Sequence, residues 1–140
     1  MISIQINETH AVKHPFFQER VIKGKRPGTR EFVASIDGLE SGLLIFEHFP
    51  ERSLALVYEI YVLAESRGLG VGNRVLSHAQ AVAVASGCEV LGLWVRSLDQ
   101  ERITDNDLSS WYGRNGFERE TGNTGWMQMN LVSARTKAIG

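Results

Sequence analysis

Apolar and polar residues alternate in the first part of the chain in a way that is typical of β-strands. Isoleucines alternate with polar residues over residues 2–7, and a period of two indicates a strand with one buried face. Two further apolar runs, at 31–36 and 42–49, flank Asp37-Gly38, a dipeptide that favours hairpin turns. The pattern therefore predicts three antiparallel strands before the middle of the chain.

A long apolar run covers residues 54–63, is rich in β-branched and aromatic side chains and contains a single charge, Glu59. Such a run is typical of a central strand that is covered on both faces. The glycine-rich segment 67–72 follows, after which apolar residues recur at helical spacing until Ser86-Gly87. We therefore expect a strand, a glycine-rich turn and a helix in direct succession.

Shorter patterns predict the remaining elements, namely a helix over 14–22, a strand over 89–95, a helix over 104–114 and a pair of strands over 117–119 and 125–132. Pro15 falls in the first turn of the first helix, where proline is tolerated. Thr104 and Asp107 have capping-box spacing at the start of the second. Because a helix joins the central strand to the next one, we expect these two strands to be parallel or splayed. The tail from residue 133 is expected to be frayed.

Composition narrows the class of protein. A chain of 140 residues with 43% hydrophobic and 22% charged residues fits a single domain, 1–140. The net charge of -1 argues against a protein that coats nucleic acid. Four basic residues in one segment indicate a solvated loop, the alternative being a contact to an acidic substrate or nucleic acid: Lys23, Lys25, Arg26 and Arg30. With a single cysteine, Cys88, the chain cannot form an internal disulfide, and the sequence predicts no metal site. Cys88 itself is expected in the core. Without a visible signal peptide or membrane span, we expect a cytoplasmic protein with no membrane partner.

The glycine-rich segment 67–72 is the best candidate for chemistry. A helix begins with unpaired backbone N–H groups and the positive end of its dipole, and glycines leave these donors accessible to a phosphate. Arg67 adds a positive charge at the rim. A P-loop would need a lysine that is absent, and a dinucleotide fingerprint would need a glycine where Val71 or Asn73 stands. Both of these nucleotide-binding motifs are therefore excluded.

What the spacing does match is Arg67-x-x-Gly70-x-Gly72, and here the chain resembles the GNAT superfamily of N-acetyltransferases. Residues 60–62 lie where that family has its Tyr-Val strand end, although a common proline is replaced by Ala64. The resemblance implies that main-chain amides hold the pyrophosphate of acetyl-coenzyme A and that the strand edge holds its pantetheine. The implied coenzyme contacts are Ile60, Tyr61, Val62, Arg67, Gly68, Leu69, Gly70, Val71, Gly72 and Asn106.

A second landmark of the same family lies near the end of the chain. Trp111-Tyr112 is followed by Gly116-Phe117 at the family's spacing, and one helix and one strand separate this landmark from the glycine turn. In the family, a tyrosine near this position often gives a proton to the coenzyme A thiolate. Tyr112 is thus the candidate general acid, the alternative being an aromatic ring packed on the sheet.

The resemblance also implies a fold. We expect an α/β (α+β) domain with a mixed, mostly antiparallel twisted sheet of about 6–7 strands and helices on both faces. The helical region before residue 30, which shapes the acceptor pocket in the family, has room here for about one helix instead of two. The asparagine that commonly begins the helix of Tyr112 aligns with Asp105, one residue before Asn106.

The general base is less defined by the sequence. Glu59 is the only carboxylate in the central strand, where burial would make it a useful base for an ammonium substrate. Strand alternation also allows it to form a structural ion pair with Arg96 or Arg67. Glu47 and His48 on the preceding strand are further candidates.

The function that these motifs predict is transfer of an acetyl group from acetyl-coenzyme A to a primary amine, by direct attack in a ternary complex. The alternative is a catalytically silent coenzyme A binding module that acts through a protein partner. The acceptor, whether a small molecule or a peptide or protein amine, cannot be read, because fold does not fix substrate. Nucleic acid is disfavoured as a partner, and aromatic residues such as Phe49 and Trp126 permit a homodimer.

Overall fold

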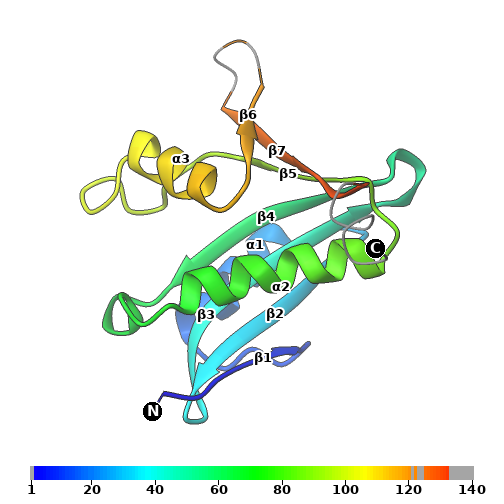
Figure 1. Ribbon diagram of the computed structural model, residues 1–140. Coiled ribbons are helices and arrows are strands. Elements are labelled where there is room, and N and C mark those ends of the chain that lie inside the picture. Colours follow the sequence, from blue (N-terminus) through cyan, green and yellow to red (C-terminus); the bar gives the residue numbers. More distant parts are fainter. Residues whose placement is uncertain (1, 121, 123–124, 133–140) are drawn as a thin grey trace.

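A seven-stranded sheet in the order β1-β2-β3-β4-β5-β7-β6 forms the centre of the molecule in the computed structural model, which describes residues 2–120, 122 and 125–132 (Figure 1). The strands are β1 (Ile4–Glu8), β2 (Thr29–Ile36), β3 (Leu39–Phe49), β4 (Leu54–Val62), β5 (Val90–Trp94), β6 (Glu118–Arg119) and β7 (Trp126–Asn130). Neighbouring strands are antiparallel except β4 and β5, which are parallel. The predicted mixed, mostly antiparallel sheet is confirmed.

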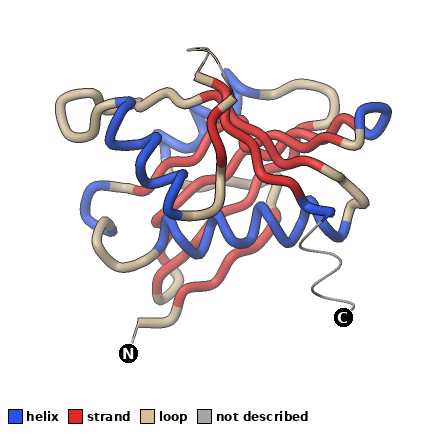
Figure 2. Tube along the Cα trace, turned by 45° about the horizontal axis from the view of Figure 1, so that its top comes forward, coloured by secondary structure: helices blue, strands red, loops and turns tan. Residues whose placement is uncertain are grey.

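Helices cover both faces of this sheet, as predicted. The α-helices are α1 (Pro15–Gly24), α2 (Val71–Ala85) and α3 (Asp105–Arg114), and two 3₁₀ turns are η1 (Pro50–Arg52) and η2 (Ala64–Ser66). α2 crosses one face and α1 lies on the other (Figures 1 and 2). The larger core, on the α2 side, contains Val71, Val75 and Ala79, whereas the smaller core on the α1 side contains Phe17 and Ile45.

Capping interactions are found at the helix ends, including those that the sequence predicted at Thr104 and Gly87. His14 caps α1, because its Nδ1 accepts a hydrogen bond from the Phe16 amide at 3.2 Å. Thr104 and Asp107 form the predicted capping box of α3. Gly87 follows α2 with a positive φ of 81°. The predicted fraying from residue 133 lies outside the described residues, and within these no helix is long and apolar enough to cross a membrane.

A β-bulge at Tyr58 changes the direction of the side chains that follow it in β4. Ile45 of β3 pairs with Glu59 and Phe46 pairs with Val57, so Tyr58 has no residue opposite it. Ala55 and Val57 belong to the α2-side core, and unbroken alternation would place Glu59 there as well. The extra residue instead turns Glu59 to the α1 side and returns the next apolar side chains to the core.

β4 and β5 pair only where they begin. Their register runs from Leu54 opposite Val90 to Leu56 opposite Gly92, and the two strands then diverge (Figure 1). Within the described residues, 57–62 of β4 therefore have no strand partner on this side. The expected splayed pair is confirmed, and it opens the sheet between its two halves.

Candidate active site

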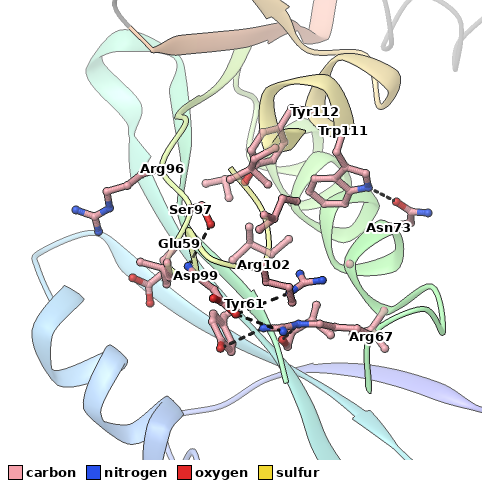
Figure 3. A pocket seen from close by; sticks show the side chains of 18 of the residues that line it. Glu59, Tyr61, Arg67, Asn73, Arg96, Ser97, Asp99, Arg102, Trp111 and Tyr112 are labelled. Carbon is pink, nitrogen blue, oxygen red and sulfur yellow. Dashed lines mark hydrogen bonds and ion pairs between the residues drawn. The ribbon is translucent and has the colours of Figure 1, made fainter. Parts of the chain in front are cut away.

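The opening between β4 and β5 is a cavity of about 710 Å³. Its wall is formed by β4, the turn after it, the first turn of α2, the loop after β5 and one side of α3 (Figure 3). Val57, Ile60 and Val62 face the α2 side of the sheet, whereas Glu59 and Tyr61 face the α1 side. The cavity therefore reaches both faces of the sheet through the splay.

The start of α2 has the form of an anion site. Gly68 and Gly70 have positive φ values of 81° and 83°, a conformation that side-chain-bearing residues rarely adopt. Gly70 is the N-cap of α2 and offers no side chain to the first amides of the helix. A Cβ at either glycine would meet no other atom within 4 Å, so space around the turn is open. Unpaired amides and the helix dipole can therefore meet a phosphate here.

Arg67 lies in this turn but does not extend freely from its rim. Its Nε donates to the Val62 carbonyl at 3.1 Å, and its guanidinium contacts the Tyr61 hydroxyl at 3.2 Å and Asp99 at 3.6 Å. Asp99 belongs to the loop after β5. Arg67 thus links the end of β4 to the opposite wall of the cavity, and the carboxylate of Asp99 partly neutralises its positive charge.

Tyr112 of α3 lines the cavity together with Leu108 and Trp111 of the same helix. Its ring lies between those of Trp111 and Phe117, at centroid distances of 5.0 and 5.7 Å, and its side chain points into the cavity (Figure 3). The residue is only 4% exposed, and burial raises the pKa of its phenol above the usual value. Tyr112 therefore keeps its proton at neutral pH and can act as a hydrogen-bond donor.

A direct contact between two helices sets the position of Tyr112. The indole Nε1 of Trp111 donates to Asn73 Oδ1 of α2 at 2.9 Å. A Cβ at Gly72 would lie 3.3 Å from the Trp111 ring, so the two helices are in close contact at this point. Tyr112 and the start of α2 are therefore held next to each other by direct contacts between their helices.

The partner of Glu59 differs from both arginines considered from the sequence. Arg20 of α1 donates through Nε to Glu59 Oε2 at 2.9 Å and through Nη2 to Oε1. The expectation of an ion pair with Arg96 or Arg67 is therefore wrong, because the bulge at Tyr58 turns the carboxylate towards α1. Both carboxylate oxygens are engaged, and the residue is 6% exposed.

Most of the predicted coenzyme contacts line the main cavity, and two do not. Ile60, Tyr61, Val62, Arg67, Gly68, Gly70, Val71 and Gly72 all line the main cavity. Leu69 is 41% exposed at the tip of the turn and is not part of the wall. Asn106 lines a second, separate cavity of about 280 Å³.

Asp105, the neighbour of Asn106, accepts hydrogen bonds from the Ser97 amide and Gln100, both at 2.8 Å, which lower the pKa of the Asp105 carboxyl.

The other candidate bases lie away from the main cavity. Glu47 is buried and lies 3.6 Å from Arg26, and neither Glu47 nor His48 is part of the cavity wall. Arg26 also lies over the Tyr58 ring, 4.1 Å from its centroid.

Ion pairs also account for most of the basic segment found in the sequence. Arg30 pairs with Glu8 at 2.8 Å and Lys23 pairs with Glu19 at 2.7 Å. With Arg26 held by Glu47, the segment has little free positive charge. Cys88 is buried in the core, as predicted.

Sequence reasoning missed the loop after β5 as a wall of the site. The cavity wall includes Trp94 at the end of β5 and, in the loop that follows, Arg96, Ser97, Asp99 and Arg102. A tryptophan and an arginine at the end of a predicted strand were the available signal. The contact of this loop with the glycine turn, between Asp99 and Arg67, depends on how β4 and β5 diverge, and local sequence patterns do not reveal that.

Comparisons with known proteins agree with this geometry. Residues 27–119 match the family model of the acetyltransferase (GNAT) domain, and the chain belongs to this family of acyltransferases. A curated relative, an uncharacterized N-acetyltransferase of Methanocaldococcus jannaschii, is 26% identical over 110 residues, which are 75% of this chain and 46% of that protein. The chain thus spans about half the length of this relative.

Solved structures with the same architecture support the fold. A nourseothricin acetyltransferase has a TM-score of 0.57 at 27% identity, with 74% of this chain and 66% of the other covered. A GNAT family acetyltransferase from Elizabethkingia anophelis, solved with acetyl-CoA bound, has a TM-score of 0.69 at 13% identity and covers 91% of this chain and 98% of its own. The resemblance predicted from the two motifs is therefore confirmed.

Proposed function

We propose that the protein transfers an acetyl group from acetyl-coenzyme A to a primary amine by direct attack in a ternary complex. The observation that supports this most strongly is one cavity that joins the open start of α2 to Tyr112 and continues through the splay to the α1 side. The relative from Elizabethkingia anophelis, which shares the fold, binds acetyl-CoA.

Three parts of the cavity would bind the cosubstrate. The amides of 68–72 meet its pyrophosphate, and the open edge of β4 over 57–62 pairs with the pantetheine amides as another strand would. This arrangement directs the thioester towards Tyr112. Arg67 then acts chiefly by fixing the end of β4, since its donors are occupied by protein groups.

The chemistry follows from these positions. The neutral amine attacks the thioester carbonyl carbon, a C–N bond forms, and the C–S bond breaks as the tetrahedral intermediate collapses. The thiolate takes a proton from Tyr112, which regains one from solvent, and the new amide gives up the extra amine proton. Holding both reactants in contact can supply about 7–11 kcal/mol of the barrier.

For Glu59 we propose a structural role in place of general base catalysis. Both carboxylate oxygens accept hydrogen bonds from Arg20, which holds the side chain towards α1. The pair instead joins α1 to β4 below the splay. The acceptor amine can lose its proton to water where the cavity opens on the α1 side of the sheet.

Acetyl-coenzyme A titration by calorimetry, followed by transfer assays on a broad amine panel, tests this function. The variant Gly70→Glu should abolish detectable binding, because it places a carboxylate and a strained backbone at the phosphate position. Gly38→Glu is the matched control, since Gly38 has a similar φ of 85° in a hairpin turn away from the cavity. Absence of binding by folded wild-type protein would refute the proposal, whereas binding without any transfer would support the silent coenzyme A module. The single domain, the cytoplasmic location and a homodimer stay predictions.

A further inference from the structure

The α1-side mouth of the cavity has a wall whose chemistry the acetyl transfer itself does not explain. Leu91 and Leu93 of β5 are in the α2-side core, so alternation places Trp94 on the opposite face. Arg96 follows two residues later, and both side chains line the cavity. Trp94 is 60% exposed, which is high for so large an apolar side chain.

The Trp94 ring is held in place by neighbouring residues. It lies 5.0 Å from the Trp126 ring at an interplanar angle of 63°. Trp126 in turn covers Gly92, where a Cβ would come within 2.2 Å of the indole. Glycine is thus required at position 92 for this packing, and β5 and β7 together present an ordered aromatic surface at the mouth.

The charge at the same mouth is positive. Of the three buried carboxylates on this face, Glu59 and Glu47 are already paired with Arg20 and Arg26, and the third, Glu31 of β2, is not part of the cavity wall. Arg96 has no ion-pair partner among the described residues, and its side chain extends away from Tyr112 on the side of Glu59 (Figure 3). A guanidinium in this position is suited to a carboxylate, which it can bind through two parallel hydrogen bonds.

We propose that the acceptor is a small primary amine that also carries a carboxylate and a flat apolar group, as an aromatic amino acid does. Arg96 binds the carboxylate, Trp94 packs against the apolar group, and the amine points through the splay towards the thioester. Arg96 follows the end of β5, and Val95 between the two residues packs against the α2-side core, which leaves Trp94 and Arg96 on the other face. Residues two apart in extended backbone are about 7 Å apart, a span that a single small molecule can bridge. This inference rests on the proposed function and names its acceptor class.

Matched amines with and without the carboxylate provide the test. Values of kcat/KM, normalised to the fraction of neutral amine, are measured for phenylalanine against phenethylamine and for tryptophan against tryptamine. The wild type should prefer each acid. Arg96→Gln should lower kcat/KM for the acids about tenfold or more, mainly through KM, and leave the decarboxylated amines nearly unchanged. Arg52→Gln, at an exposed arginine of η1 outside the cavity wall, should match the wild type.

Trp94→Ala examines the apolar half of the acceptor. It should lower kcat/KM for phenylalanine much more than for alanine, and acetyl-coenzyme A affinity should stay at the wild-type value in every variant, which also reports correct folding. A wild type that prefers the decarboxylated amines, or an Arg96→Gln variant with an unchanged preference, would overturn the inference. Transfer to other amines but to none of these acids would overturn it too, while the proposed function would stand; loss of acetyl-coenzyme A binding by the wild type would end both.

Discussion

The two ends of the cavity are built from different kinds of atoms. On the α2 side, the groups that we propose to bind the cosubstrate are main-chain amides of consecutive residues, and Gly68 and Gly70 leave them accessible. On the α1 side, they are side chains such as Trp94 and Arg96, in a wall completed by separate elements. A main-chain site depends on local conformation, whereas a side-chain site depends on which face each residue takes. We therefore expect the α2 end to be specific for one cosubstrate and the α1 end to be adjustable by single substitutions.

The largest effect is expected from Tyr112, the proton donor of the proposed mechanism. Tyr112→Phe should lower kcat about 100-fold or more, because the thiolate leaves without a proton donor. Affinity for acetyl-coenzyme A, measured by calorimetry, should change little. Tyr58→Phe removes a hydroxyl from the opposite end of the same cavity and serves as control. Equal turnover in Tyr112→Phe and wild type would remove Tyr112 from the mechanism.

A smaller effect, on stability more than on rate, is expected from the ion pair on the α1 side. Glu59→Gln leaves Arg20 without its partner and should reduce the free energy of unfolding by about 1–3 kcal/mol in urea titrations. Arg20 is 20% exposed, so water limits the loss. Turnover at a temperature where the variant is folded should fall only modestly. A loss of kcat as large as that of Tyr112→Phe, with stability unchanged, would instead identify Glu59 as the base.

The contact between α2 and α3 should give a still smaller change. Asn73→Ala removes the acceptor of the Trp111 indole N–H, a loss of about 1 kcal/mol in the free energy of unfolding. Because this contact positions α3, kcat should also fall slightly while acetyl-coenzyme A affinity is retained. Ser77→Ala, at an exposed position on the same helix, is the control for helix propensity. An unchanged kcat would show that the contact does not help to position Tyr112.

The pH profile should show the smallest effect of all. Burial raises the pKa of Tyr112, so the phenol stays protonated through the neutral and mildly alkaline range and loses its proton only above the usual value of about 10. We therefore expect no fall in kcat from this group between pH 7 and about pH 10, measured in stopped-time assays of thiol release. A fall in that range that disappears in Tyr112→Phe would contradict the assignment of a raised pKa.

The sequence predicted the α2 side of the molecule better than the α1 side, for physical reasons. The segment 67–72 lies between a strand and a helix that follow one another in the chain, so its conformation follows from local spacing. The capping box at Thr104 and Asp107 is equally local. Such features need no knowledge of the register between distant segments.

The α1 side could not be predicted in the same way, because it depends on a single extra residue. Without the bulge at Tyr58, alternation would place Glu59 on the α2 side, and no composition signal marks the bulge. The partner Arg20 lies 39 positions earlier in the chain, on a helix whose rotation only packing decides. Asn106 was carried over from the family pattern, but the helix turns it to the smaller cavity.

The unpaired length of β4 has a consequence for the protein when no cosubstrate is bound. Residues 57–61 then have no strand partner on the β5 side and lie beside apolar side chains, which is a template for strand addition by another chain. An occupied cavity would cover this edge and protect the protein from self-association. Bound acetyl-coenzyme A would then protect the protein from aggregation in addition to serving as a reactant. Concentrated samples prepared with it should aggregate less on storage than samples without it.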